Sequence, residues 1–351
     1  MPNLKFIIFL SFAILFCAFA NPAVKHVDGE YHVYPGSNNK GFTFNTIQEA
    51  IDAAVDDGWG TIEKPGAVIV HESDSAYKGD KNDEIRLPLP LKLISSTGST
   101  AVVMSPVINA TVIVTNINVQ DFLFPVTTGT IQGFRFFCPP EKPCVVYNDN
   151  GLNNGLLTLT FCTISKYDEG TAVVAVGGTV VIHHNRFYIP IGMCLTTQDC
   201  LHVHLEFNTF FTKKIFKMSS PNVPLLGGGH FIRNQIDDPF PFLADDVEMD
   251  FFNFESSGHN FEISYNSVLA DAINGSIKDV RFLTIHPDSK NLDLKVTHNM
   301  ILIGKQGGVN LLYDVPNDPS VVIRTGANTI SSQPVFVSDV TAGNYDILIE
   351  I

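Results

Sequence analysis

One short motif recurs along the sequence from residue 130 onward. Each copy has two apolar residues two positions apart, two variable residues, a position that is often Asn, one variable residue and a further apolar residue, as in ValHisLeuGluPheAsnThrPhe at 203–210. Successive copies start 23 to 33 residues apart. The position that is often Asn is occupied by Phe134, Cys162, Asn185, Asn208, Asn234, Asn266, Asn299 and Asn328.

This repeat limits the fold more than any other feature. Apolar residues two positions apart are typical of strands, whereas helical repeats place them three or four apart. A repeat of this length is typical of a solenoid in which each copy forms one coil and pairs with the next. The content of 26 Gly, 20 Pro and 27 Phe also suits short strands and turns. The sequence therefore predicts an all-β fold, a right-handed parallel β-helix.

The repeated Asn residues are predicted to be structural. In stacked coils, an Asn at the same turn can donate its side-chain amide to the Asn of the next coil. Cys162 shares this column and is predicted to be a small buried thiol. The apolar residue three positions earlier is expected to point into the core; these residues are Leu159, Ile182, Leu205, Phe231, Ile263 and Val296.

A short helix at about residues 45–57 is predicted to cover the open N-terminal end of the solenoid. The apolar residues Ile47, Ala50, Ile51, Ala54 and Val55 fall on one helical face. Asn45 is expected to cap the helix at its start, with Gln48 three residues later, and Gly58 to end it. Such a helix would protect a sheet edge that is otherwise open to pairing.

In its repeat and its predicted capping helix, the chain resembles the pectin-lyase-like superfamily of right-handed parallel β-helices. The likeness lies in the segments at 44–58, 66–70 and 89–96, which are similar to the cap and first coil, and at 333–339 and 342–347, which resemble the closing coil. The resemblance implies an extracellular polysaccharide as the partner. It names no enzyme family, because the Asn-Thr-Asp and Arg-Ile-Lys segments of polygalacturonases are absent and the single Trp lies near the cap.

The N-terminus predicts export. Lys5 precedes an apolar run from Phe6 to Phe19, and Ala18 and Ala20 form the small-residue pattern of a signal peptidase site, so residues 1–20 are predicted to be a signal peptide. Residues 21–351 are then one secreted β-helix domain with no membrane span. A net charge of −14 argues against nucleic acid or an anionic membrane as the partner.

The cysteines and two sequons fit a secreted protein. Cys138 and Cys144 are separated by five residues, as are Cys194 and Cys200. Each pair is predicted to close a surface loop as a disulfide and to leave Cys162 free, with metal ligation by the thiols as the alternative. Glycosylation is predicted at two sites, Asn109 and Asn274.

The repeat register predicts one unusual outward patch. Residues four and two positions before the Asn column point outward, which places four titratable side chains on consecutive coils: His183, His204, Glu206 and His230. Two further residues, His184 and Arg233, lie at the adjacent turn. Two lysines and two aspartates are expected at its flank: Lys213, Lys214, Asp237 and Asp238.

The residue types of this patch are compatible with three interpretations. The imidazoles, Glu206, Arg233 and the two lysines are candidates for acid/base catalysis on a sugar, with His184, Asp237 and Asp238 contacting the substrate and calcium held by the two aspartates. Imidazole and carboxylate together also suit Zn or Cu. The third interpretation is an ordinary solvated strand face.

The sequence thus predicts a secreted protein that binds an extracellular polysaccharide, with cleavage by lyase or hydrolase chemistry left open. The alternative is a non-catalytic structural or adhesive protein of a surface, wall or coat.

Overall fold

The computed structural model describes residues 27–36, 41–78, 83–97, 105–116, 127–149, 154–220, 227–237, 247–270, 277–303, 308–331, 335–336 and 349–350. The predicted signal peptide, Asp238 and Asn274 lie outside these residues. Apart from one helix, α2 (Ile47–Asp56), the described elements are strands.

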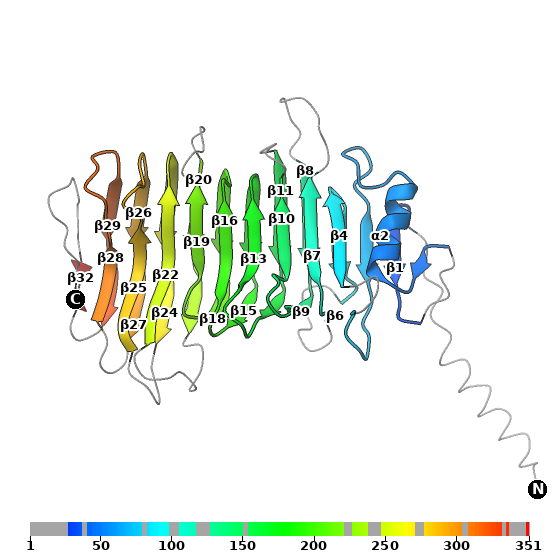
Figure 1. Ribbon diagram of the computed structural model, residues 1–351, viewed down its shortest axis with the longest axis horizontal. Helices are drawn as coiled ribbons and strands as arrows, with labels where there is room; N and C mark the ends of the chain where they lie inside the picture. The colour runs from blue at the N-terminus through cyan, green and yellow to red at the C-terminus, as the bar shows by residue number, and fades with distance from the viewer. Residues whose placement is uncertain are drawn as a thin grey trace, which may run out of the picture.

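The strands form three sheets in which neighbouring strands are parallel. In the middle of the molecule the chain passes from a strand of sheet A to one of sheet B and then one of sheet C, and the next coil repeats this order. The coils follow one another along the long axis of the molecule in chain order, with α2 at the N-terminal end and β32 at the other (Figure 1). This arrangement is consistent with the predicted parallel β-helix.

The strand counts that follow are those of the described residues. Sheet A has twelve strands: β2 (Thr43–Phe44), β1 (Glu30–Val33), β3 (Ala67–Val70), β5 (Lys92–Ser95), β8 (Thr127–Gln132), β11 (Gly155–Thr160), β14 (Thr179–His183), β17 (His202–Glu206), β20 (Gly227–Ile232), β23 (His259–Ser264), β26 (Asp293–Thr297) and β29 (Val322–Gly326). Sheet B has ten: β6 (Val107–Ile108), β9 (Arg135–Phe137), β12 (Thr163–Ser165), β15 (Arg186–Ile189), β18 (Thr209–Thr212), β21 (Gln235–Asp237), β24 (Ser267–Ala270), β27 (Met300–Ile303), β30 (Asn328–Ser331) and β32 (Ile349–Glu350). Sheet C also has ten: β4 (Glu84–Leu89), β7 (Thr111–Asn116), β10 (Val145–Asn148), β13 (Thr171–Val176), β16 (Met193–Gln198), β19 (Phe216–Ser220), β22 (Val247–Ser256), β25 (Ile277–Ile285), β28 (Gly308–Tyr313) and β31 (Val335–Phe336).

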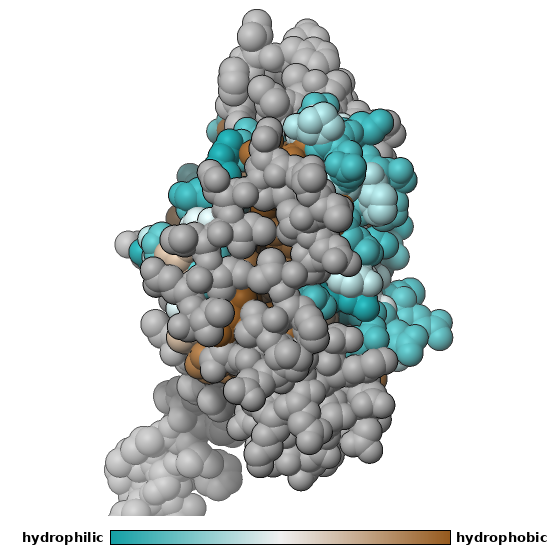
Figure 2. Space-filling model, turned by 90° about the vertical axis from the view of Figure 1, so that its left-hand side faces the viewer, coloured by the Kyte–Doolittle hydropathy of each residue, from teal (hydrophilic) through white to brown (hydrophobic). Residues whose placement is uncertain are grey.

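The core lies between the three sheets. The predicted inward residues, from Leu159 to Val296, are all buried, and the Phe187 and Phe210 rings stack with their centroids 5.0 Å apart. A view onto the C-terminal end shows brown apolar residues in the middle and teal hydrophilic residues at the outside (Figure 2). The alternation read from the sequence is therefore confirmed in sheet A.

The Asn column forms the predicted ladder at the corner between sheets A and B. The side-chain amide of Asn208 donates to Ile182 O at 2.8 Å and to Asn234 Oδ1 at 3.0 Å. The same pattern links each Asn to the next, from Asn185 as far as Asn328. At the start of the ladder, Cys162 N donates to Asn185 Oδ1 at 2.8 Å, and Cys162 is buried and free, as predicted.

Replacing Asn208 with leucine is expected to lower the free energy of unfolding by about 1–3 kcal/mol, because buried groups on the coils on either side lose their partners. Urea denaturation measures the loss. Asn260→Leu, at an exposed position of β23, is the control and should change stability little. Equal stability of the Asn208 variant and the wild-type protein would show that the ladder contributes nothing.

The capping helix forms as predicted, with two differences in detail. Its N-cap is Thr46, whose hydroxyl accepts from Glu49 N at 3.2 Å, rather than Asn45, whose side chain instead accepts from Gly36 N at 2.6 Å. Val55 is not on the buried face, since it is 42% exposed. The helix ends before Gly58, which has a positive φ of 81°.

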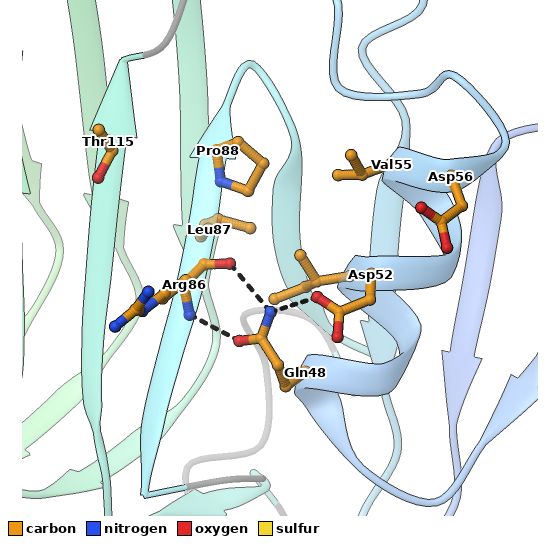
Figure 3. A pocket seen from close by; sticks show the side chains of 9 residues that line it. Gln48, Asp52, Val55, Asp56, Arg86, Leu87, Pro88 and Thr115 are labelled. Atoms are coloured by element: carbon orange, nitrogen blue, oxygen red, sulfur yellow. Dashed lines mark hydrogen bonds between the residues drawn. The ribbon is translucent and has the colours of Figure 1, made fainter.

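The helix covers the edge of sheet C through one glutamine. β4 is the edge strand, and its Arg86 N donates to Gln48 Oε1 at 2.7 Å while Gln48 Nε2 lies 3.5 Å from Arg86 O. The Gln48 side chain therefore bonds β4 as a neighbouring strand would. Asp52, which accepts from Gln48 Nε2 at 2.7 Å, holds the amide in place beside an open hollow of about 610 Å³ between α2 and β4 (Figure 3).

The disulfide prediction is confirmed for one pair and wrong for the other. Cys138 and Cys144 are bonded, with Cα atoms 4.6 Å apart, because the proline-rich segment between them turns back. Cys194 and Cys200 are free and buried. Cys194 is the second residue of the extended strand β16, and Cys200 lies two residues after the end of that strand. Six residues of strand span about 20 Å, far beyond the reach of a disulfide.

Candidate functional site

The outer face of sheet A gathers the titratable side chains that the repeat predicted. In the register of the parallel strands, His183 of β14 lies opposite Glu206 of β17, and His204 of β17 lies opposite His230 of β20. These four side chains are all partly exposed. Together with His184 and Arg233, which follow β14 and β20, they are called the sheet A patch below.

The centre of the patch is a contact between two imidazoles and a carboxylate. The ring centroids of His204 and His230 are 4.3 Å apart, and their Nδ1 atoms are 3.0 Å apart. The other ring nitrogen of His230, Nε2, bonds Glu206 Oε1. The three groups come from two adjacent strands and form one continuous hydrogen-bonded chain.

The second pair of imidazoles lies one coil earlier. His183 Nδ1 is 3.1 Å from Thr160 Oγ1 and 2.9 Å from His184 Nδ1. Burial lowers the pKa of His183, and the neighbouring His184 lowers it further, against the opposing effect of Glu206. Burial also lowers the pKa of His204, to about 4, with His230 and His202 adding to the effect. Both imidazoles are therefore neutral at pH 7.

Residues just before the ladder form a stacked column at the corner between sheets A and B, and this column includes His184 and Arg233 of the patch. Each has a positive φ, which turns its side chain outward: 53° for Phe161, 57° for His184, 53° for Phe207 and 56° for Arg233. The His184 ring stacks on Phe161 and on Phe207, with centroids 5.1 and 5.0 Å apart, and the Arg233 guanidinium lies 5.5 Å from the Phe207 ring. Aromatic and cation–π contacts therefore hold this corner.

Sequence reasoning missed the aromatic members of this column. Tyr265 and His298 continue it in the next two coils after Arg233, with their ring centroids 4.8 Å apart. The signal was present, because each of these residues immediately precedes a residue of the ladder, which is Cys162 after Phe161 and an Asn after the others. What the motif did not indicate is that this position adopts the left-handed conformation and points its side chain to the outside.

Ion pairs extend the polar face of sheet A towards the C-terminus. Glu262, opposite His230, accepts from Lys295 Nζ at 3.0 Å, and this bond lowers the pKa of Glu262. Arg324 pairs with Asp293 at 2.5 Å. Beyond β20 the charges of this face thus neutralise one another in pairs.

The predicted flanking residues do not join the patch. Lys213 and Lys214 follow β18 and so lie at the far end of a sheet B strand from the Asn corner, about 13 Å along the chain direction. Asp237 lies on β21 of sheet B, where its carboxylate accepts from Gln235 Nε2 at 3.0 Å. Asp238 is outside the described residues.

The described residues add no support to the metal and glycosylation predictions. Over the described part of the chain, no three His, Cys, Asp or Glu side chains are arranged to hold a metal ion. The calcium interpretation depends on Asp238, which lies outside the described residues, and stays a prediction. Asn109 is exposed at the turn between β6 and β7, and its glycosylation stays a prediction. No helix among the described residues is long and apolar enough to cross a membrane.

Comparison with known proteins found no relative of this chain. No protein-family model, curated protein or solved structure matches the chain.

Proposed function

We propose that this chain is a right-handed parallel β-helix related to the pectin-lyase-like superfamily, that it is exported, and that it binds an extracellular polysaccharide along the sheet A patch. The buried disulfide-linked Cys144 supports export, because disulfides persist in oxidising compartments. The predicted signal peptide and sequons agree with this proposal.

The observation that carries the binding proposal is the Glu206–His230–His204 chain on a regular face. Neighbouring strands of a sheet lie about 4.8 Å apart, so successive coils present equivalent positions along a line. A linear polymer lying parallel to the axis would meet such positions in turn. Imidazole and carboxylate groups bond sugar hydroxyls, and the exposed Phe161 and Phe207 beside them supply apolar contact.

A structural or adhesive role is the second candidate. It is favoured by the ladder and by the corner column, in which planar side chains cover one another's faces and stiffen the solenoid. In that case the polar side chains of sheet A would only keep its outer face hydrated and would bind no ligand.

Polysaccharide binding is tested by incubating residues 21–351 with a panel of uronate and neutral polymers. We expect at least one polymer to bind, and the double variant His204→Ala/His230→Ala to bind it at least about tenfold more weakly, a loss of about 1.4 kcal/mol. His286→Ala, which removes an exposed imidazole near sheet C, is the matched control and should leave binding unchanged.

The same incubations show whether the bound polymer is cleaved. New reducing ends without unsaturated products indicate a hydrolase, and unsaturated products indicate a lyase. If no polymer binds, or if the double variant binds as well as the wild-type protein, the polysaccharide proposal fails and the structural role replaces it.

A further inference from the structure

The hydrogen bonds of the Glu206–His230–His204 chain fix where the protons lie. Glu206 is a carboxylate and can only accept, so the His230 nitrogen that bonds it, Nε2, carries a proton. With His230 in its neutral form, its Nδ1 is then an acceptor. His204 Nδ1, 3.0 Å away, must donate to it. A neutral His204 with its proton on Nδ1 has an unprotonated Nε2.

This Nε2 of His204 is free to receive a ligand. Among the residues that the structure describes, it has no hydrogen-bond partner, and the side chain is partly exposed on the outer face. The titratable groups around the ring are His202 and Glu206 on its own strand, His230 on β20 and His183 on β14. Burial keeps His204 neutral, since it lowers the pKa of the imidazole to about 4.

We propose that Glu206 and His230 are positioning residues that hold His204 Nε2 as a hydrogen-bond acceptor for a hydroxyl group of an uncharged saccharide. The inference rests on the proposed function and names its ligand class. A sugar hydroxyl is a donor that matches this acceptor. Uronate residues carry hydroxyl groups too, so the choice of an uncharged saccharide rests on the charges around the acceptor.

The charge of the protein also favours an uncharged ligand. The chain has a net charge of −14, which repels a polyanion at long range. Within the patch, Glu206 is negative and the guanidinium of Arg233 lies against the Phe207 ring. The patch therefore offers one cation and one anion, with no excess positive charge to hold a row of carboxylates.

The proton arrangement has a distinct state at low pH. If His230 carries a proton on both ring nitrogens, both of them donate. His204 Nδ1 then accepts, and its own proton lies on Nε2. His204 Nε2 is then a donor instead of an acceptor.

The proton positions are tested without any ligand, by long-range ¹H–¹⁵N correlation NMR of histidine-labelled protein. At pH 8 we expect His204 in the Nδ1–H form and His230 in the Nε2–H form, and we expect His204 to change form as the pH is lowered. Glu206→Ala should abolish the fixed form of His204, and Glu206→Gln, whose side-chain oxygen still accepts, should restore it. A His204 with its proton on Nε2 at pH 8 would overturn the inference.

The ligand class is tested by comparing neutral polymers with polyuronates of similar length at low salt. We expect a neutral polymer to bind at least about tenfold more tightly, and His204→Phe, which keeps a ring but no acceptor, to weaken it about tenfold. Tighter binding of a polyuronate would overturn the ligand class but leave polysaccharide binding standing. If no polymer of either kind binds, the proposed function itself fails.

Discussion

Replacing Asp168 with alanine is expected to lower the free energy of unfolding by about 3–5 kcal/mol. Asp168 pairs with Lys166, whose side chain is fully buried, at 2.8 Å. The other partner of the ammonium group is Lys142 O, at 2.9 Å. Removing the carboxylate leaves a buried cation without its counter-charge, which costs more than the pair contributes when intact.

Asp168 also anchors the disulfide loop, so its loss has a second effect. Its carboxylate accepts from Glu141 N at 3.1 Å and Gly170 N at 2.8 Å. Burial alone would raise the pKa of Asp168, but the bonds from Lys166, Gly170 N and Glu141 N together lower it. The loop closed by Cys138 and Cys144 should therefore become more mobile in the Asp168 variant.

Lys166→Met is the matched variant. It removes the buried charge together with its need for a partner, and Asp168 is 35% exposed and can be solvated, so we expect a smaller loss of about 1–2 kcal/mol. Adding Lys166→Met to Asp168→Ala should recover part of the stability. Urea denaturation of the three variants measures these losses. If Asp168→Ala is as stable as Lys166→Met, the unpaired buried cation is not the cause of the lost stability.

The sheet geometry could be predicted from the sequence because it depends on one short motif. The spacing of two between apolar residues decides which side chains face the core, and the recurring Asn decides how the coils align. Both follow from local backbone geometry, and His204 and His230 were therefore placed side by side correctly. The turns between sheets B and C carry no such motif, which is why Lys213 and Lys214 were expected too close to the imidazoles.

The wrong disulfide has a related cause. Five residues separate the cysteines in both pairs, but the segment after Cys138 contains prolines, whereas the segment after Cys194 alternates buried Leu195 and Thr197 with partly exposed residues. The separation along the chain alone does not distinguish a turn from a strand. The burial pattern does, but two adjacent threonines, Thr196 and Thr197, hide this pattern in the sequence.

Lowering the pH from 7.5 to 4.5 is expected to destabilise the protein through two imidazoles, His204 on β17 and His71, which follows β3. Burial lowers the pKa of His71 and of His204 from 6.5 to about 4, and in each case a neighbouring imidazole, His32 or His230, lowers it further. The unfolded chain therefore binds protons first as the pH falls. The stability is fully present above pH 6.5 and is lost between pH 6.5 and 4.

The size of this loss follows from the pKa shifts. A full shift would be worth about 3 kcal/mol for each imidazole, and solvent screening of partly exposed rings lowers this to about 1–2 kcal/mol. Urea denaturation at the two pH values should therefore differ by roughly 2–4 kcal/mol. Lowered carboxyl pKa values, as at Asp168 and Glu262, act in the same direction but mainly below pH 4.5.

The double variant His71→Gln/His204→Gln separates the imidazoles from the carboxyl groups. It should lose the part of the pH dependence that His71 and His204 cause, whereas His183 and His259, whose pKa values burial also lowers, keep their part. His286→Gln, at an exposed imidazole, should keep the full pH dependence. Carboxyl titration is the same in all three proteins, so it cancels in the comparison. If the double variant and the wild-type protein lose stability in parallel, other groups cause the acid sensitivity, and the two imidazoles are not held neutral by the sheet.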